Sequence, residues 1–220
     1  MALTKEELIA AIEEAIGALR TVYTDAAREA DLYEAALLAV ATEAAEAAGG
    51  ACLITNDGVS AASSAVFRTQ PGNLYAGNFT YVLASFSGGR QVEIHLGVYV
   101  AGKSGVLHEC DVAVLDQEEA ERSRVGSVHP RSRNLVAAVE AKHYSASPRL
   151  RVGREFIGLA SEMGPGKCTL AFPAPGGSNI MPLLAKHPGE CFDELIPGTP
   201  PADLMRGHIT QKIKNWINRT

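Results

Sequence analysis

The sequence is short of net basic charge and of long apolar runs, and each shortage excludes a class of protein. Its 220 residues carry a net charge of -5 at pH 7, so any contact with nucleic acid must come from local patches rather than from the whole surface. No apolar segment approaches the roughly 20 residues that cross a bilayer. Acidic residues begin at Glu6, which is unlike a signal peptide. These features predict a soluble protein without a membrane partner.

Cysteine is scarce as well. The four cysteines are widely spaced and form no Cys-x-x-Cys pair: Cys52, Cys110, Cys168 and Cys191. This usage is typical of a reducing compartment, so we expect a cytoplasmic protein. A Gly-x-Ser-x-Gly nucleophile elbow, which would support a hydrolase triad, is also absent.

The chain nevertheless has enough apolar material for one domain with extensions, because 46% of its residues are hydrophobic. Thr4 and Glu7 form a capping box ahead of an expected helix over residues 5–22. A second helix is expected over residues 26–48, where a pair of glycines follows. Glu34 is an isolated carboxylate in the apolar stripe of this helix, and it lies either at the rim of the stripe or toward a buried polar site.

Short alternating segments come next. They predict strands over residues 51–55, 65–68, 80–86, 92–100 and 106–115. The last two can pair as a hairpin through a five-residue turn. In that register Gly97 lies opposite Glu109, and His95 lies opposite Asp111.

The second half of the chain begins with a charged connection over residues 116–133, for which we expect a solvated loop that can include one helical turn. The other expected elements are strands over 136–144 and 168–172, a helix through 152–163, a helix within 180–195, a stiff linker over 196–201 and a basic helix over 205–220.

Two of these strands carry ionisable side chains together on one face. The two-residue period puts Glu109 beside Asp111 on one strand and Glu140 beside Lys142 on the other. Converging carboxylates repel each other unless a cation lies among them, and oxygen ligands select Mg²⁺ or Mn²⁺. A lysine nearby can help deprotonate a metal-bound water or stabilise charge on a phosphate. The alternative is an ion-pair ladder across exposed strands, but the small apolar residues before Glu140 indicate a buried strand.

The order of these elements resembles the PD-(D/E)xK nuclease superfamily, which has a restriction-endonuclease-like fold. The resemblance covers about residues 26–172: a helix with Glu, a hairpin with Asp, a strand with Glu-x-Lys, an amphipathic helix and a strand. It implies an α/β protein with a central mixed β-sheet flanked by α-helices. We therefore expect an N-terminal helical extension over residues 1–25, the nuclease domain over 26–195, and a linker with a basic C-terminal helix over 196–220.

Carried onto this chain, the resemblance implies that Asp111 and Glu140 bind the metal and that Lys142 is catalytic. Glu34 corresponds to the first-helix glutamate of many members, and Glu109 is expected to support the metal. The implied function is a Mg²⁺-dependent or Mn²⁺-dependent endonuclease, with DNA as the expected substrate. The residues themselves do not separate DNA from RNA.

One position departs from the superfamily name, since Cys110 stands where proline would be, a change that leaves the chemistry intact. Lys103 and Arg154 are candidate contacts to nucleic acid; the alternatives are a solvated hairpin tip and a solvent-facing arginine. A homodimer would suit an enzyme that cuts both strands of a duplex. The rival function is a non-catalytic nucleic-acid-binding or scaffold module with the same fold.

Two other motifs in the sequence indicate a function only weakly. Residues 97–104 match the phosphate-loop pattern literally, but a strand rather than a helix follows them, so a nucleotide-binding switch is the weakest of the three functions. Zinc would need His95, His108 and Cys110 together, and strand alternation puts His95 on the opposite face.

Overall fold

The fold is seen in a computed structural model of the chain. The structure describes residues 29–63, 65–68, 70–143, 147–187 and 189–219. The helix expected over residues 5–22 and the N-terminal extension over 1–25 lie outside the described residues.

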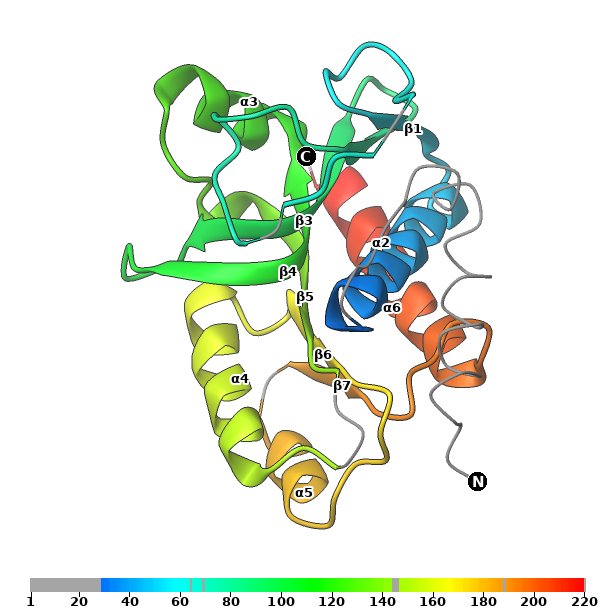
Figure 1. Ribbon diagram of the computed structural model, residues 1–220, viewed down its shortest axis with the longest axis vertical. Helices are drawn as coiled ribbons and strands as arrows, with labels where there is room; N and C mark the ends of the chain where they lie inside the picture. The colour runs from blue at the N-terminus through cyan, green and yellow to red at the C-terminus, as the bar shows by residue number, and fades with distance from the viewer. Residues whose placement is uncertain (1–28, 64, 69, 144–146, 188, 220) are drawn as a thin grey trace.

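A seven-stranded mixed sheet forms the centre of the fold, and its strands lie side by side in chain order (Figure 1). Neighbours from β1 to β5 are antiparallel, whereas β6 and β7 continue the sheet in parallel with β5. The strands are β1 (Ala51–Thr55), β2 (Tyr81–Ser85), β3 (Gln91–Ala101), β4 (Leu107–Asp116), β5 (Leu135–Ala141), β6 (Cys168–Ala171) and β7 (Glu190–Phe192). Branched residues at alternate positions of β3 and β4 favour this pleated arrangement.

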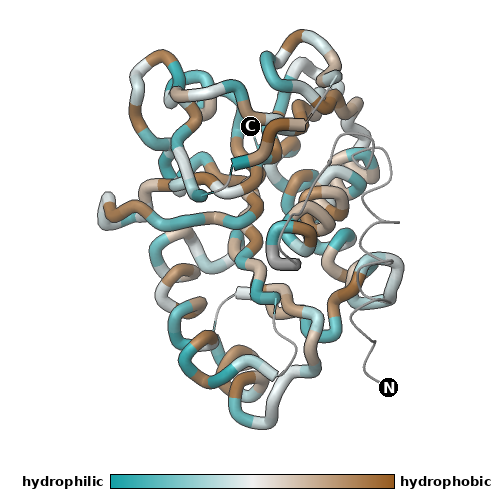
Figure 2. The backbone as a smooth tube through the Cα atoms, viewed as in Figure 1, coloured by the Kyte–Doolittle hydropathy of each residue, from teal (hydrophilic) through white to brown (hydrophobic). Residues whose placement is uncertain are grey.

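Helices cover both faces of the sheet. The described α-helices are α2 (Glu29–Ala47), α3 (Gln117–Gly126), α4 (Leu150–Met163), α5 (Ile180–Leu184) and α6 (Pro200–Ile217). Buried residues of α2 and α6 join one hydrophobic core with one side of the sheet, and those of α3, α4 and α5 join a second core on the other side. Figure 2 shows the hydrophobic stretches along the central strands between these layers. The expected α/β architecture, a mixed sheet flanked by helices, is confirmed at this level.

None of the described helices combines the length and the apolar character that crossing a membrane requires.

The β3–β4 hairpin exists, but the register expected for it is wrong. Tyr99, rather than Gly97, lies opposite Glu109, and His95 lies opposite Ala113. His95 therefore does not face the candidate metal ligand on β4.

The register differs because the turn is shorter than expected. The backbone N–H of Gly102 donates to the carbonyl of Val106 at 2.8 Å, which leaves a three-residue loop between them. Gly105 ends that loop with a φ of 85°, in the left-handed region. A three-residue hairpin loop with glycine at this position is a common solution for antiparallel strands.

The charged connection after β4 contains a ten-residue helix, α3, instead of the expected loop. Asp116 caps it, because its side chain accepts a hydrogen bond from a backbone N–H of the first turn. Glu119 is 2% exposed and accepts hydrogen bonds from Arg122, Arg131 and Asn134. These contacts tie α3 to the segment that enters β5.

One smaller expectation also fails. Residues 65–68 do not form a strand; Val66 instead exchanges hydrogen bonds with Thr80. The helix expected within 180–195 is confirmed as the short helix α5, and the same region also contains β7, a strand that the sequence did not predict.

Arg90 fastens the C-terminal end of α6 to the sheet, so its replacement by alanine should destabilise the fold. Its Nη1 donates to the carbonyls of Trp216, Ile217 and Arg219 at 2.6, 2.9 and 3.0 Å, and its guanidinium lies 4.0 Å from the Trp216 ring centroid. We expect Arg90→Ala to lower the free energy of unfolding by about 2 kcal/mol, as measured by urea denaturation. Arg151→Ala, at a side chain that is 86% exposed, is the control. Equal midpoints for the two variants would contradict the role of Arg90.

Candidate active site

The aspartate of β4 and the Glu-x-Lys segment of β5 meet in the structure. Asp111 is only 5% exposed, and its Oδ2 accepts a hydrogen bond from the backbone N–H of Ala141 at 2.6 Å. Ala141 is the residue between Glu140 and Lys142 and the last residue of β5. The three residues that the sequence singled out are therefore neighbours.

Asp111 lies at the point along the β3–β4 hairpin where the inward-facing side chains stop contributing to one core and begin contributing to the other. The facing residues Leu96 and Val112 belong to the core under α2, whereas the next facing pair, Val98 and Cys110, belongs to the core under α4. Gly97 lies between these pairs and has a φ of 54°, which glycine adopts at little cost. The change of face at this point makes room for a polar side chain between two apolar cores.

Glu140 and Lys142 form an ion pair with each other. Lys142 Nζ lies 2.6 Å from Glu140 Oε1, and the two side chains are 29% and 19% exposed. A pair that water reaches in this way contributes little to stability. Both groups can therefore exchange this partner for a ligand at small cost.

Two further carboxylates interact electrostatically with this pair. Burial raises the pKa of Glu34 to about 7, and repulsion from Asp31, Glu109 and Glu140 adds to the effect of burial, although Lys142 opposes it. Loss of water and repulsion from Glu140 also raise the pKa of the Glu109 carboxyl. Glu34 and Glu109 thus belong to the same cluster as the Glu-x-Lys segment.

Asp111 is the most perturbed member of the cluster. Burial first, and then the negative charge of Glu140, hold its pKa well above the ordinary value of an aspartate. Lys142 and the hydrogen bond from Ala141 act in the opposite direction but do not cancel the effect. Carboxylates crowded in this way are stabilised in the ionised form by an added cation.

The donor set fits a magnesium ion that takes few ligands from protein. No group of three or more His, Cys, Asp and Glu side chains is arranged as a metal site among the described residues. Mg²⁺, however, often uses one or two carboxylates and completes its shell with water and phosphate oxygens. The contacts described above use Oδ2 of Asp111 and Oε1 of Glu140, so the proposed cation would bind the other oxygen of each carboxylate.

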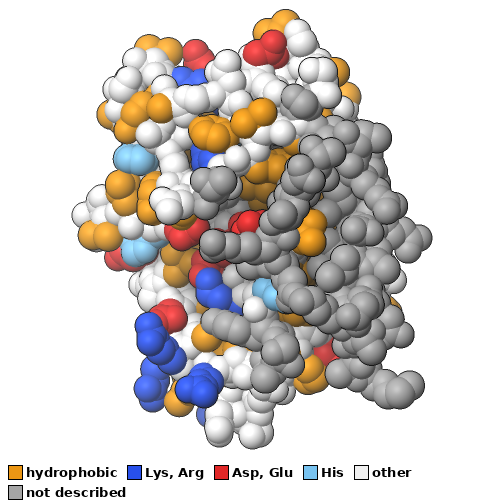
Figure 3. Space-filling view, in the orientation of Figure 1, with side chains coloured by type: hydrophobic (Ala, Val, Ile, Leu, Met, Phe, Trp, Pro, Cys, Tyr) orange, Lys and Arg blue, Asp and Glu red, His pale blue; other side chains and the backbone are white. Residues whose placement is uncertain are grey.

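Both candidate nucleic-acid contacts are close to α4: Arg154 belongs to this helix, and Lys103 lies on the hairpin tip that contacts it. Lys103 is exposed at the hairpin tip, and its backbone N–H donates to the carbonyl of Glu162 at 3.0 Å, which docks the tip on α4. Arg154 is exposed about two helical turns earlier on the same helix. Figure 3 shows basic side chains gathered over the part of the molecule where Figure 1 places α4, and acidic side chains nearer the ends of β4 and β5.

Sequence reasoning missed the aromatic contact that borders this cluster. The rings of Tyr33 and His143 lie 5.7 Å apart, and the Tyr33 hydroxyl donates to the carbonyl of Leu195 at 3.1 Å. His143 follows Lys142, and Tyr33 precedes Glu34, so this contact joins the two chain segments that carry the candidate groups. The only signal in the sequence was the position of Tyr33 within the apolar stripe of α2.

The phosphate-loop pattern and the zinc pattern do not form sites in the described part of the chain. Most of residues 97–104 belong to β3, and the hairpin turn and β4 follow, so no phosphate-binding loop opens a helix there. His95 Nε2 pairs with Glu93 at 2.8 Å, and Cys110 is buried in the core under α4, so they do not form a zinc site.

A comparison of this chain with models of known protein families, with curated proteins and with solved structures found no significant match. The geometry of the described residues is therefore the basis of the functional assignment.

Proposed function

We propose that this protein is a metal-dependent nuclease that hydrolyses phosphodiester bonds, with Mg²⁺ or Mn²⁺ as its cofactor. The observation that carries the proposal is the 2.6 Å hydrogen bond from Ala141 to Asp111. It brings a buried carboxylate of β4 against the Glu-x-Lys segment of β5, and this is the combination of groups that phosphodiester hydrolysis requires.

Each residue has a distinct task in this proposal. Asp111 and Glu140 would hold the cation, which when bound neutralises phosphate charge and makes a water ligand more acidic. Lys142, released from its contact with Glu140, attracts the phosphate oxygens and orients the attacking water. Glu34 has a pKa of about 7, so it can accept or release a proton at neutral pH. Glu109 adds negative charge beside the cation.

The order of elements supports a restriction-endonuclease-like core. A helix with Glu34 precedes the hairpin that carries Asp111; the strand with Glu140 follows, and then α4 and the parallel strand β6. Lys103 and Arg154 are proposed to contact the phosphates of the bound nucleic acid, which we expect to be DNA. A two-fold dimer in the cytoplasm completes the proposal, since symmetry would suit cleavage of both strands.

The alternative is a non-catalytic nucleic-acid-binding or scaffold module with the same fold. One observation favours it: Glu140 and Lys142 already neutralise each other, as they would in a purely structural pair. The alternative predicts that divalent cations do not bind.

A cleavage panel tests the proposal directly. Labelled single-stranded and double-stranded DNA and RNA are incubated with the full chain and about 5 mM MgCl₂ or MnCl₂, a concentration chosen to be roughly saturating for a weak cation site. A parallel reaction contains EDTA in place of the cation. We expect products in the presence of either cation and none with EDTA, as analysed on denaturing gels. The absence of cleavage of every substrate, together with an unchanged melting temperature on adding Mg²⁺, would exclude the nuclease and favour the binding module.

A further inference from the structure

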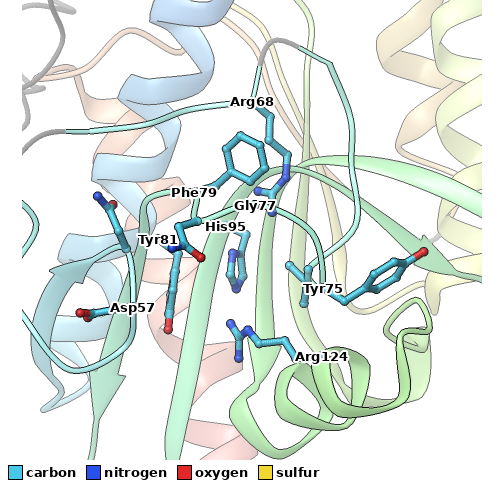
Figure 4. A pocket seen from close by; sticks show the side chains of 11 residues that line it. Asp57, Arg68, Tyr75, Gly77, Phe79, Tyr81, His95 and Arg124 are labelled. Carbon is cyan, nitrogen blue, oxygen red and sulfur yellow. The ribbon is translucent and has the colours of Figure 1, made fainter.

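A separate pocket of about 230 Å³ lies on the other side of the hairpin, between β3, α3 and the segment that precedes β2 (Figure 4). Its walls carry two arginines, a histidine and three aromatic rings: Arg68, Arg124, His95, Tyr75, Phe79 and Tyr81. In Figure 4 Arg68 reaches down from its loop toward His95, and Arg124 approaches His95 from the opposite side. None of these residues belongs to the candidate active site.

Arg68 carries a positive charge that no carboxylate neutralises among the described residues. Its Nη1 and Nη2 donate to the backbone carbonyls of Leu96 and Asn73 at 3.2 and 2.9 Å, and its guanidinium lies 4.3 Å from the Phe79 ring centroid. Its Nε is buried and has no hydrogen-bond partner in the described part of the chain. Burial and the nearby Arg124 lower the pKa of Arg68 to about 10, so the group is still charged at pH 7.

The other charges around the pocket are already in use. Glu93 is 1% exposed and binds Arg124, with Nη1 at 2.9 Å from Oε1, and it also binds His95 Nε2 at 2.8 Å. Burial lowers the pKa of His95, so His95 is neutral at pH 7. Asp57 at the rim accepts hydrogen bonds from the backbone N–H groups of Val59 and Ser60, both at 2.8 Å. These N–H groups do not cancel the charge of Asp57, which stays ionised at the rim, but neither Glu93 nor Asp57 forms an ion pair with Arg68 in the described part of the chain.

The lining also offers groups for the uncharged part of a ligand. Tyr75 is 38% exposed at the edge of the pocket, but its ring points away from Arg68 and His95 (Figure 4) and lies 5.9 Å from the ring of His129 in a T-shaped contact. Asn78 is exposed beside it and supplies an amide for hydrogen bonds. The volume lies below the roughly 300 Å³ at which drug-sized pockets begin, which limits the occupant to a small molecule or one unit of a polymer.

We propose that this pocket binds the phosphate group of a mononucleotide-sized ligand, with Arg68 as the cation that pairs with it. Guanidinium groups are well suited to phosphate, since their planar array of N–H donors matches its oxygens. The exposed amide of Asn78 is then available to hydrogen-bond the rest of the nucleotide. The ligand is either a free mononucleotide or a single nucleotide of a strand, and both present the same chemistry to Arg68.

The test is calorimetric titration of the full chain in 5 mM EDTA, a concentration chosen to remove roughly all free divalent cations so that neither cleavage nor metal binding contributes. The probes are inorganic phosphate, adenosine 5′-monophosphate, adenosine and a short single-stranded DNA. We expect the monophosphate to bind and adenosine, which lacks the phosphate, to bind at least about tenfold more weakly. Inorganic phosphate should compete with the monophosphate.

Three variants connect the binding to the pocket. Arg68→Gln removes the charge and should weaken binding of the monophosphate at least about tenfold. Because Arg68 also holds two backbone carbonyls, Asn78→Phe provides a second route: it fills the pocket from an exposed position and leaves Arg68 in place. Arg151→Gln removes an exposed arginine of α4 as the matched control and should bind like the wild type. Circular dichroism checks that each variant is folded.

The outcomes separate the sources of the ligand and can overturn the inference. Binding of DNA that depends on Arg68, without binding of the free monophosphate, assigns the pocket to one nucleotide of a strand. The inference is wrong if no phosphate-bearing probe binds, or if Arg68→Gln and Asn78→Phe both bind as tightly as the wild type. Because EDTA is present throughout, a failure of the nuclease proposal would leave these results unaffected.

Discussion

Replacing Lys142 by alanine is expected to reduce cleavage of nucleic acid by about 100- to 1,000-fold while leaving the fold intact, because one positive group that stabilises the reacting phosphate is lost. Its side chain is 29% exposed and forms an ion pair of little structural value, so the melting temperature should change little. Stabilisation by Mg²⁺ should remain, since the proposed metal ligands are untouched. The measurements are the initial cleavage rate and the thermal melting curve with and without Mg²⁺.

Asp111→Asn is the companion variant and should lose both cleavage and stabilisation by Mg²⁺. The asparagine carbonyl can still accept the hydrogen bond from Ala141, so the local structure should survive. For the wild type, a cation at ten times its dissociation constant adds about 1.4 kcal/mol to the free energy of unfolding, and Asp111→Asn should show none of this gain. Lys214→Ala, an exposed lysine of α6, is the control. Wild-type rates for Lys142→Ala or Asp111→Asn would show that the cluster is not catalytic.

Glu34→Gln is expected to make the protein more stable above neutral pH. The pKa of Glu34 rises from 4.5 to about 7 on folding, so at pH 8 the folded protein holds a carboxylate that is more costly than in the unfolded chain. Each pKa unit corresponds to about 1.4 kcal/mol, and since water partly screens this site we expect a gain of about 2 kcal/mol.

The difference in stability between Glu34→Gln and the wild type should grow as the pH rises. Below pH 4.5 Glu34 is protonated in both states, so the variant and the wild type should differ little. Between pH 4.5 and about 7 the unfolded state releases the proton first, and the wild type loses stability relative to the variant as the pH rises. Urea denaturation at pH 4, 6 and 8 measures this difference, with Glu46→Gln, an exposed glutamate on the same helix, as the control. A difference that stays constant from pH 4 to pH 8 would contradict the burial of Glu34 in the acidic cluster.

The elements that carry the candidate site could be predicted because their patterns are local. Branched apolar residues at every second position of β3, and the apolar run that begins β5, are enough to define strands, and the two-residue period puts Glu109 and Asp111 on one face of β4. The capping of α3 was also available locally, since Asp116 and Glu119 have the spacing of a capping box. The segment is highly charged, however, and lacks the apolar stripe of helical period that accompanies a capping box in a buried helix.

The register of the hairpin could not be read from the same pattern. Moving one strand of a hairpin by two residues keeps every side chain on its face, so the pairing of Glu109 with Gly97 or with Tyr99 satisfies the alternation equally well. The turn decided between them, through the left-handed conformation of Gly105.

By itself, the sequence determined strands β1 to β6, the helices α2, α4 and α6 and the identity of the groups in the acidic cluster, because periodicity and residue chemistry act over a few neighbouring positions. Only the tertiary structure decided that Asp111 touches the backbone between Glu140 and Lys142, and that Arg68 and Arg124 share a pocket with His95. These residues come from separate segments of the chain, and their positions in the sequence do not determine how far apart they lie after folding.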